Sequence, residues 1–175
     1  ETSKHIRDGI RGDFKYEIKQ DKEANTLYIF NDNVEHHETN KPGGGSAKIR
    51  PYNRYGTGYN GKTRSAGIAT GKDGKGFEKL DDIPKQFINA HINEIKELLE
   101  SGKYDKVKYS VGQDKKLGSK IFPNLGDDVK EYIVEQLKKT VNDVNKSNRI
   151  TGNGEKLAEK LNNTLDDALE KIKDN

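Results

Sequence analysis

The 175-residue sequence contains no cysteine, no methionine and no tryptophan, and only 4 prolines. The absence of cysteine excludes disulfides, thiolate metal sites and cysteine nucleophiles. Hydrophobic residues make up only 30% of the chain, and no apolar run approaches the ~20 residues that a transmembrane helix needs. The first residues also lack the apolar stretch of a signal peptide. From these absences we expect a cytoplasmic protein that neither spans nor binds a membrane.

Basic residues and glycines are concentrated in the middle of the chain. Lys and Arg total 32 against 29 Asp and Glu, and this net charge of +3 excludes a histone-like polycation. Residues 41–75 nevertheless hold eight basic side chains and one acidic one, and ten of the 18 glycines lie between Gly43 and Gly76. A basic, glycine-rich segment of this kind predicts a site for an anionic ligand. The alternative interpretation is a solvated, flexible loop.

The hydrophobic pattern predicts an α/β domain, because strands alternate with helices along the chain. Expected strands cover 14–18, 26–30, 66–70 and 106–112, and expected helices begin near Asp81 or Asp82 and near Asp127. We divide the chain into an extension of residues 1–13, a domain of residues 14–147 and a C-terminal amphipathic helix within 148–175. That last helix carries a leucine at every fourth position, which suits packing on the domain or on a second copy in a homo-oligomer. These leucines are Leu157, Leu161, Leu165 and Leu169.

Two short motifs resemble known sites but lack the surroundings that such sites need. Residues 56–63, GTGYNGKT, match the phosphate-loop pattern, yet neither a buried strand before them nor a helix after them is expected. An ATPase is therefore disfavoured. His36, His37 and Glu38 are metal-ligand residue types without a metal-binding spacing. We expect a solvent-exposed loop there and assign no metal.

Loop 50–64 interleaves basic and aromatic residues, as surfaces that bind single-stranded nucleic acid do. A net charge of +3 is low for a dedicated nucleic-acid binder, because affinity grows with the number of phosphates neutralised. The tyrosines of this loop are equally suited to packing back onto the fold. Nucleic-acid binding is kept as an alternative function, carried by Arg50, Tyr52, Arg54, Tyr55, Tyr59, Lys62 and Arg64.

Three segments in chain order give the strongest indication of a ligand site. The strand at 28–33 ends in the side chains of Asn31, Asp32 and Asn33. Residues 41–49 contain three consecutive glycines, which let a backbone approach a ligand closely. A second glycine-bounded, basic loop, residues 111–122, follows a later strand. Loops after the carboxyl ends of neighbouring parallel strands surround one crevice, where ligands of α/β proteins usually bind.

The order of these segments resembles the macro domain family of ADP-ribose binders, and more closely the compact macro-like proteins of phage genomes. The resemblance rests on Phe30-Asn31-Asp32-Asn33, on the glycine loop and on Gly67-Ile68-Ala69-Thr70, and covers residues 24–142. It implies a three-layer, macro-like mixed sheet flanked by helices. It also implies binding of ADP-ribose or a related signalling nucleotide without any further cofactor. By analogy, such a protein sequesters the nucleotide in a host cytoplasm during phage counter-defence.

The resemblance assigns roles to the residues of the three segments. Asn31 or Asn33 would hold a ribose hydroxyl, the glycine loop would wrap the distal ribose and a phosphate, and the second loop would bind the diphosphate. The second loop is lysine-rich and has Asp114 as its only acid, which favours binding over turnover and leaves an ADP-ribosyl or phosphoester hydrolase as an alternative. The expected ligand-binding residues are Asn31, Asp32, Asn33, Gly43, Gly44, Gly45, Ser46, Arg50, Thr70, Gly112, Lys116, Gly118 and Ser119.

Overall fold

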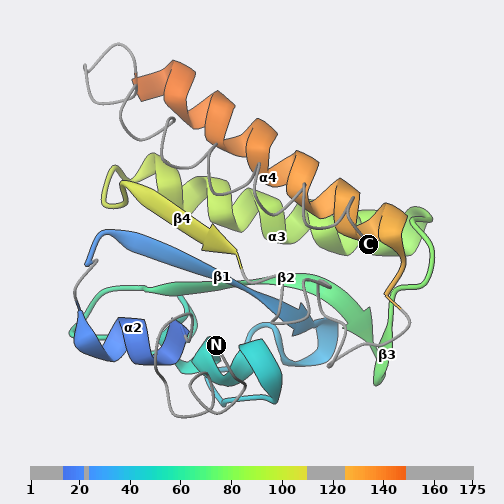
Figure 1. Cartoon of the computed structure of the whole chain (residues 1–175), viewed down its shortest axis with the longest axis horizontal. Coiled ribbons are helices and arrows are strands. Elements are labelled where there is room, and N and C mark those ends of the chain that lie inside the picture. The colour runs from blue at the N-terminus through green and yellow to red at the C-terminus, as the bar shows by residue number, and fades with distance from the viewer. Residues whose placement is uncertain (1–13, 22–23, 110–124, 149–175) are drawn as a thin grey trace, which may run out of the picture.

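A mixed sheet of four strands forms the centre of the computed structural model, which describes residues 14–21, 24–109 and 125–148. The strand order is β3-β2-β1-β4 (Figure 1). The three longer strands are parallel to one another, whereas β3 pairs with the end of β2 in the antiparallel sense. The strands are β1 (Thr26–Asn33), β2 (Ser65–Lys72), β3 (Lys75–Gly76) and β4 (Lys106–Tyr109).

Helices flank both faces of this sheet, which confirms the expected α/β class (Figure 1). Two long helices, α3 (Asp82–Glu100) and α4 (Asp127–Asn148), lie on one face. The short helix α2 (Phe14–Gln20) and the 3-10 helix η2 (Gly45–Tyr52) lie on the other. A further 3-10 turn, η1 (Val34–His36), follows β1. The connection from β1 to β2 therefore brings the glycine loop to the face opposite α3.

Strand β1 is buried on both faces because helices cover the sheet from both sides. Leu27 and Ile29 belong to the larger hydrophobic cluster, which includes the buried faces of α3 and α4. Tyr28 and Phe30 point the other way into a smaller cluster completed by α2 and η2. This alternation is the period of two expected of a strand. It places Asn31 and Asp32 on opposite faces at the carboxyl end of β1.

The strand expected at residues 14–18 is wrong, because these residues form helix α2. Phe14 and Ile18 are four residues apart, so they share one face of a helix as readily as one face of a strand. In the structure both pack into the smaller cluster, where the Phe14 ring lies 4.8 Å from the Tyr28 ring. Tyr16, which would have shared that face in a strand, is instead exposed.

The expected helix near residue 82 is confirmed as α3, with Ile88, Ile92 and Ile95 buried along one face. It ends where Gly102 adopts a left-handed φ of 76°. No helix among the described residues is long and apolar enough to cross a membrane. The extension of residues 1–13, the end of the strand expected at 106–112 and the C-terminal helix beyond Asn148 lie outside the described residues.

Candidate functional site

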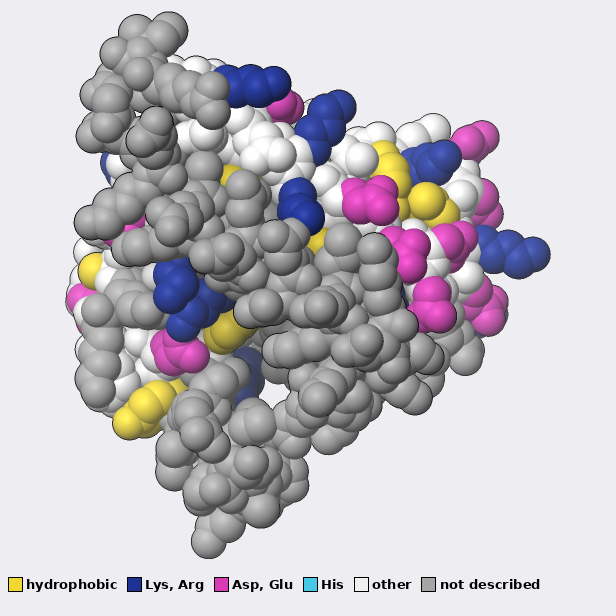
Figure 2. Space-filling view, turned by 45° about the horizontal axis from the view of Figure 1, so that its top comes forward, with side chains coloured by type: hydrophobic (Ala, Val, Ile, Leu, Met, Phe, Trp, Pro, Cys, Tyr) yellow, Lys and Arg dark blue, Asp and Glu magenta, His cyan; other side chains and the backbone are white. Residues whose placement is uncertain are grey.

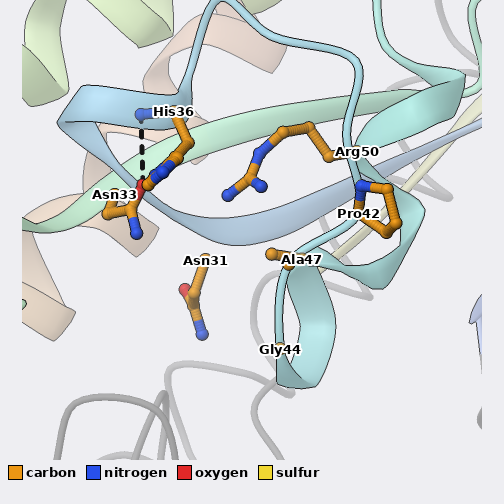
Figure 3. A pocket seen from close by; sticks show the side chains of 8 residues that line it. Asn31, Asn33, His36, Pro42, Gly44, Ala47 and Arg50 are labelled. Carbon is orange, nitrogen blue, oxygen red and sulfur yellow. Dashed lines mark hydrogen bonds between the residues drawn. The ribbon is translucent and has the colours of Figure 1, made fainter.

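A hollow of about 160 Å³ lies at the carboxyl end of β1, beside the first glycine loop (Figure 3). Its position agrees with the general rule that ligands of α/β proteins bind at the carboxyl ends of parallel strands. Five of the residues that line it were expected from the sequence to bind a ligand, and three were not. The expected ones are Asn31, Asn33, Gly43, Gly44 and Arg50, and the others are His36, Pro42 and Ala47.

The glycine loop is fastened to β1 by a side chain of its own. The backbone N–H of Asn31 donates to the Ser46 hydroxyl oxygen at 3.1 Å. Within the loop, the Gly43 N–H donates to the Ala47 carbonyl at 3.1 Å. Gly43 also passes close to the guanidinium of Arg50, because a Cβ at residue 43 would lie 2.9 Å from Nη1. A glycine at this position therefore lets the loop backbone lie against the arginine.

Two asparagine side chains, those of Asn31 and Asn33, contribute their amides to the lining of the hollow. The Tyr109 hydroxyl donates to Asn31 Oδ1 at 2.7 Å, and burial raises the pKa of Tyr109, so this phenol stays neutral and keeps its proton. Asn33 Oδ1 accepts from the backbone N–H of His36 at 3.2 Å and lies 3.0 Å from Nδ1 of the same histidine. Both amides are thus held by contacts to their oxygen atoms.

Arg50 reaches the hollow from η2 and forms a buried ion pair with Asp32. Its Nε and Nη2 donate to Asp32 Oδ1 at 3.1 and 2.5 Å, and its Nη1 donates to the Lys41 carbonyl at 3.0 Å. The Asp32 side chain has no exposed surface and that of Arg50 is 4% exposed. A buried pair of this kind persists only when its charges are satisfied by several hydrogen bonds. Asp32 meets that condition, since Oδ1 also accepts from the Asn33 N–H at 2.9 Å.

His37 extends this ion pair to helix α3. Its Nδ1 lies 3.1 Å from Asp32 Oδ2 and its Nε2 lies 2.7 Å from Glu94 Oε1. The other oxygen of Glu94 accepts from the Tyr55 hydroxyl at 2.7 Å. The expectation of a solvent-exposed loop at 36–38 is therefore wrong for His37, which is only 5% exposed. No local pattern in the sequence indicates this burial, because His37 and Glu94 are 57 positions apart.

A second histidine, His91 of α3, stacks on His37 with ring centroids 3.4 Å apart and planes 10° from parallel. Burial lowers the pKa of His37, but hydrogen bonds and attraction from Asp32 and Glu94 outweigh burial and raise it to about 9. Burial and the neighbouring His37 charge lower the pKa of His91 to about 4. At neutral pH His37 is therefore positively charged and His91, stacked on it, is neutral. The buried Nδ1 of His91 has no hydrogen-bond partner among the described residues.

The other expected ligand-binding residues support the hollow or lie outside the described chain. Asp32 contacts the guanidinium of Arg50, and Thr70 donates its hydroxyl to the Asp32 carbonyl at 3.2 Å, linking β2 to β1. Gly45 and Ser46 shape the loop, with Gly45 at a left-handed φ of 56°. The second predicted glycine loop lies at residues 110–124, outside the described residues, so its approach to the first loop stays a prediction. The site residues concerned are Gly112, Lys116, Gly118 and Ser119.

The phosphate-loop match at 56–63 lies at the opposite, amino edge of the sheet. The Lys62 ammonium donates to the carbonyls of Ala24 and Lys103, in the segments that lead into β1 and β4. Tyr59 and Lys62 close a tight turn through backbone bonds of 2.8 and 3.1 Å. A phosphate loop instead follows the carboxyl end of a strand and directs its lysine toward phosphates. In this structure Lys62 instead fastens residues 56–63 to the segments that precede β1 and β4.

Among the residues that the structure describes, no group of three or more acidic or histidine side chains is arranged to hold a metal ion. Asp32 and Glu94 contact different nitrogens of His37 and so form a chain, not a coordination shell. In comparisons with known proteins, the chain matches no family model, no curated protein and no solved structure. The resemblance to macro domains therefore stays a prediction from the residues that carry it.

Proposed function

We propose that the chain binds ADP-ribose or a related signalling nucleotide at the carboxyl end of β1. The observation that carries this proposal is the hollow, where a glycine loop, two amides and an arginine meet. Its 160 Å³ is below the roughly 300–1,000 Å³ of pockets that enclose whole small molecules. It suits one phosphate or sugar, so the rest of a nucleotide would extend beyond it. The macro-like, three-layer assignment belongs to the same proposal.

Binding without turnover is the form of this function that the contacts favour. Asp32 is the acid that contacts Arg50 in the described part of the chain, and a general base needs a carboxylate oxygen within reach of water or substrate. Oδ1 of Asp32 already accepts from Arg50 and from the Asn33 N–H, and its Oδ2 faces His37. A carboxylate engaged in this way is a structural anchor. Sequestering a nucleotide requires only binding, whereas the hydrolase alternative needs a free base.

The nucleic-acid alternative depends on loop 50–64, whose described side chains are largely engaged within the protein. Tyr52 and Tyr59 pack on the smaller hydrophobic cluster and contact each other edge to face. Arg54 pairs with Glu97 at 2.8 Å, and Arg64, 1% exposed, pairs with Asp21 at 2.7 Å. Base stacking and phosphate contacts need exposed rings and cations. These contacts favour the nucleotide proposal over the nucleic-acid one.

A thermal-shift series with ADP-ribose and a panel of other nucleotides tests the proposal. A ligand that binds only the folded protein raises its melting temperature by mass action. Gly44→Asp is expected to abolish the shift, because it adds a negative charge at the lining. The fold should tolerate this change, since a Cβ at residue 44 meets no atom within 4 Å. Asn60→Asp is the control: it makes the same change of charge at the amino edge, at a left-handed φ of 53° that both residues accept.

The control variant should keep the full shift of the wild-type protein. Absence of any shift across the nucleotide panel would contradict the proposal. So would an equal shift in wild type and Gly44→Asp, because the ligand would then bind elsewhere.

A further inference from the structure

The two asparagines at the hollow differ from free amides in which of their atoms remain available. Asn31 Oδ1 is occupied by the Tyr109 hydroxyl, and Asn33 Oδ1 by the N–H and the ring of His36. Neither Nδ2 donates to any residue in the described part of the chain. An amide oxygen can accept two hydrogen bonds, so the two contacts of Asn33 Oδ1 fill it, whereas Asn31 Oδ1 keeps one acceptor position. The contacts therefore orient both amides so that the two N–H groups of each Nδ2 are available to a ligand.

The remaining polar side chains of the lining add donors. Arg50 uses three of its N–H groups on Asp32 and Lys41, and a guanidinium has five. His36 Nδ1 faces the Asn33 amide oxygen, which only accepts, so this ring nitrogen carries a proton. Figure 3 shows the Arg50 guanidinium pointing toward Asn33 and His36, with Asn31, Ala47 and Gly44 below them in this view. Apart from the exposed His36 ring and one acceptor position on Asn31 Oδ1, the described side chains of the lining supply no acceptor to a ligand.

The Asp32 carboxylate, which contacts Arg50 beside the hollow, has its charge compensated by neighbouring cations. Asp32 lies between the guanidinium of Arg50 and the ring of His37, and its side chain is fully buried. Arg50 and His37 together carry two positive charges against the single negative charge of Asp32. Glu94 lies on the far side of His37. A donor-rich surface without an uncompensated acid is the environment that favours an anion.

We infer that the hollow holds one oxyanion group of the ligand, a phosphoryl group, bound by Nδ2 of Asn31, Nδ2 of Asn33 and the guanidinium of Arg50. This inference rests on the proposed function and refines it, because the resemblance assigned a ribose hydroxyl to Asn31 or Asn33. A hydroxyl both donates and accepts, and this lining offers it few acceptors. A phosphoryl oxygen only accepts, which matches the donors of the hollow.

The test is calorimetric titration of the full chain with pyrophosphate and with ADP-ribose. Asn33→Asp replaces the donating NH₂ by a charged acceptor of the same shape, and Asn33 is only half-buried, so the fold should survive. We expect pyrophosphate and ADP-ribose to bind the wild type, and both to bind Asn33→Asp at least about tenfold more weakly. Asn60→Asp serves as the control of equal charge and should keep wild-type affinity. Ribose, which lacks the phosphoryl group, should not compete.

The outcomes separate this inference from the proposed function. If ADP-ribose binds the wild type and Asn33→Asp equally well, the inference is overturned while the proposed function stands. If pyrophosphate binds the wild type and is lost in Asn33→Asp, but no nucleotide binds, the inference stands and the proposed function fails. If pyrophosphate does not bind the wild type at all, or if ribose competes with ADP-ribose, the inference is overturned. Unfolding of each variant, followed in parallel, identifies any loss that is caused by misfolding.

Discussion

Gly67 shows how one residue without a side chain makes room for the buried charges. It lies on β2 opposite Phe30 of β1, and a methyl group at residue 67 would stand 2.8 Å from Asp32 Cβ and closer still to its carboxylate. Asp32 cannot move away, since Arg50 and His37 hold both of its oxygens. The buried ion pair of Asp32 therefore requires a residue without a side chain at position 67.

Gly67→Ala is expected to lower the free energy of unfolding by about 1–3 kcal/mol, the usual cost of overpacking a tight core. Urea unfolding followed by circular dichroism measures this change. Gly44→Ala is the matched control, because a Cβ there meets no atom within 4 Å and its φ of −78° suits any residue. Equal stability of the two variants would show that Asp32 is free to shift.

At the scale of elements, Glu94 and Glu97 of α3 both contact the residues that follow η2. The two glutamates differ in how far their side chains are exposed to solvent. Glu94 joins His37 and Tyr55 from a side chain that is 23% exposed. Glu97 pairs with Arg54 at 2.8 Å, but its side chain is 64% exposed. Water and salt screen the Arg54–Glu97 pair. Loss of Glu94, in contrast, leaves the Nε2 group of the buried His37 without its hydrogen-bond partner.

Glu94→Ala should therefore lower the free energy of unfolding by about 1–3 kcal/mol. Glu97→Ala, one helical turn away, should lower it by less than about 1 kcal/mol. Chemical denaturation at low and at high salt measures both. We expect added salt to remove the small effect of Glu97→Ala and to leave that of Glu94→Ala. A larger loss for Glu97→Ala than for Glu94→Ala would contradict this account of the link between η2 and α3.

At the scale of the whole molecule, Figure 2 shows how charges are arranged on one face of the described residues. In Figure 2 the Lys and Arg side chains are scattered over the visible face, and acidic side chains gather where α3 and α4 begin. The first turns of these helices carry Asp82 in α3 and Asp127 and Asp128 in α4. Acidic residues there interact favourably with the helix dipoles. Where α3 and α4 begin, the described surface is therefore acidic, unlike a nucleic-acid interface.

The stacked histidines predict how the stability of the whole molecule depends on pH. The raised pKa of His37 adds stability that is complete below pH 6.5 and is lost as pH rises to about 9. The lowered pKa of His91 has the opposite sign: its unfolded form takes up a proton below pH 6.5, so stability falls until about pH 4. Stability should peak near pH 6.5, and each flank should lose up to about 3 kcal/mol.

His91→Phe separates the two flanks, because it keeps a stacked ring and removes the group that titrates. Thermal unfolding across pH should show a shallower acidic flank for this variant and an unchanged alkaline one. The remaining acidic loss would come from Glu94, whose pKa is lowered by its hydrogen bonds to His37 and Tyr55 despite the opposing effect of burial. An acidic flank as steep as that of the wild type would contradict the assignment to His91.

The sequence by itself determined the α/β class, β1, β2 and α3, because each depends on the composition or periodicity of a few neighbouring residues. It also indicated Asn31, Asn33, Gly43, Gly44 and Arg50, since a polar strand end followed by glycines is a local pattern. Local patterns failed at residues 14–18, where a spacing of four fits helix and strand alike.

Only the tertiary structure decided what these residues contact. The partners of His37 come from β1 and from α3, and Asn31 is oriented by Tyr109, 78 positions away. Likewise, only the direction of the strands placed residues 56–63 at the edge of the sheet opposite the hollow. Burial of charges and orientation of amides depend on groups that are distant in the sequence, and no local pattern records which of these the fold brings together.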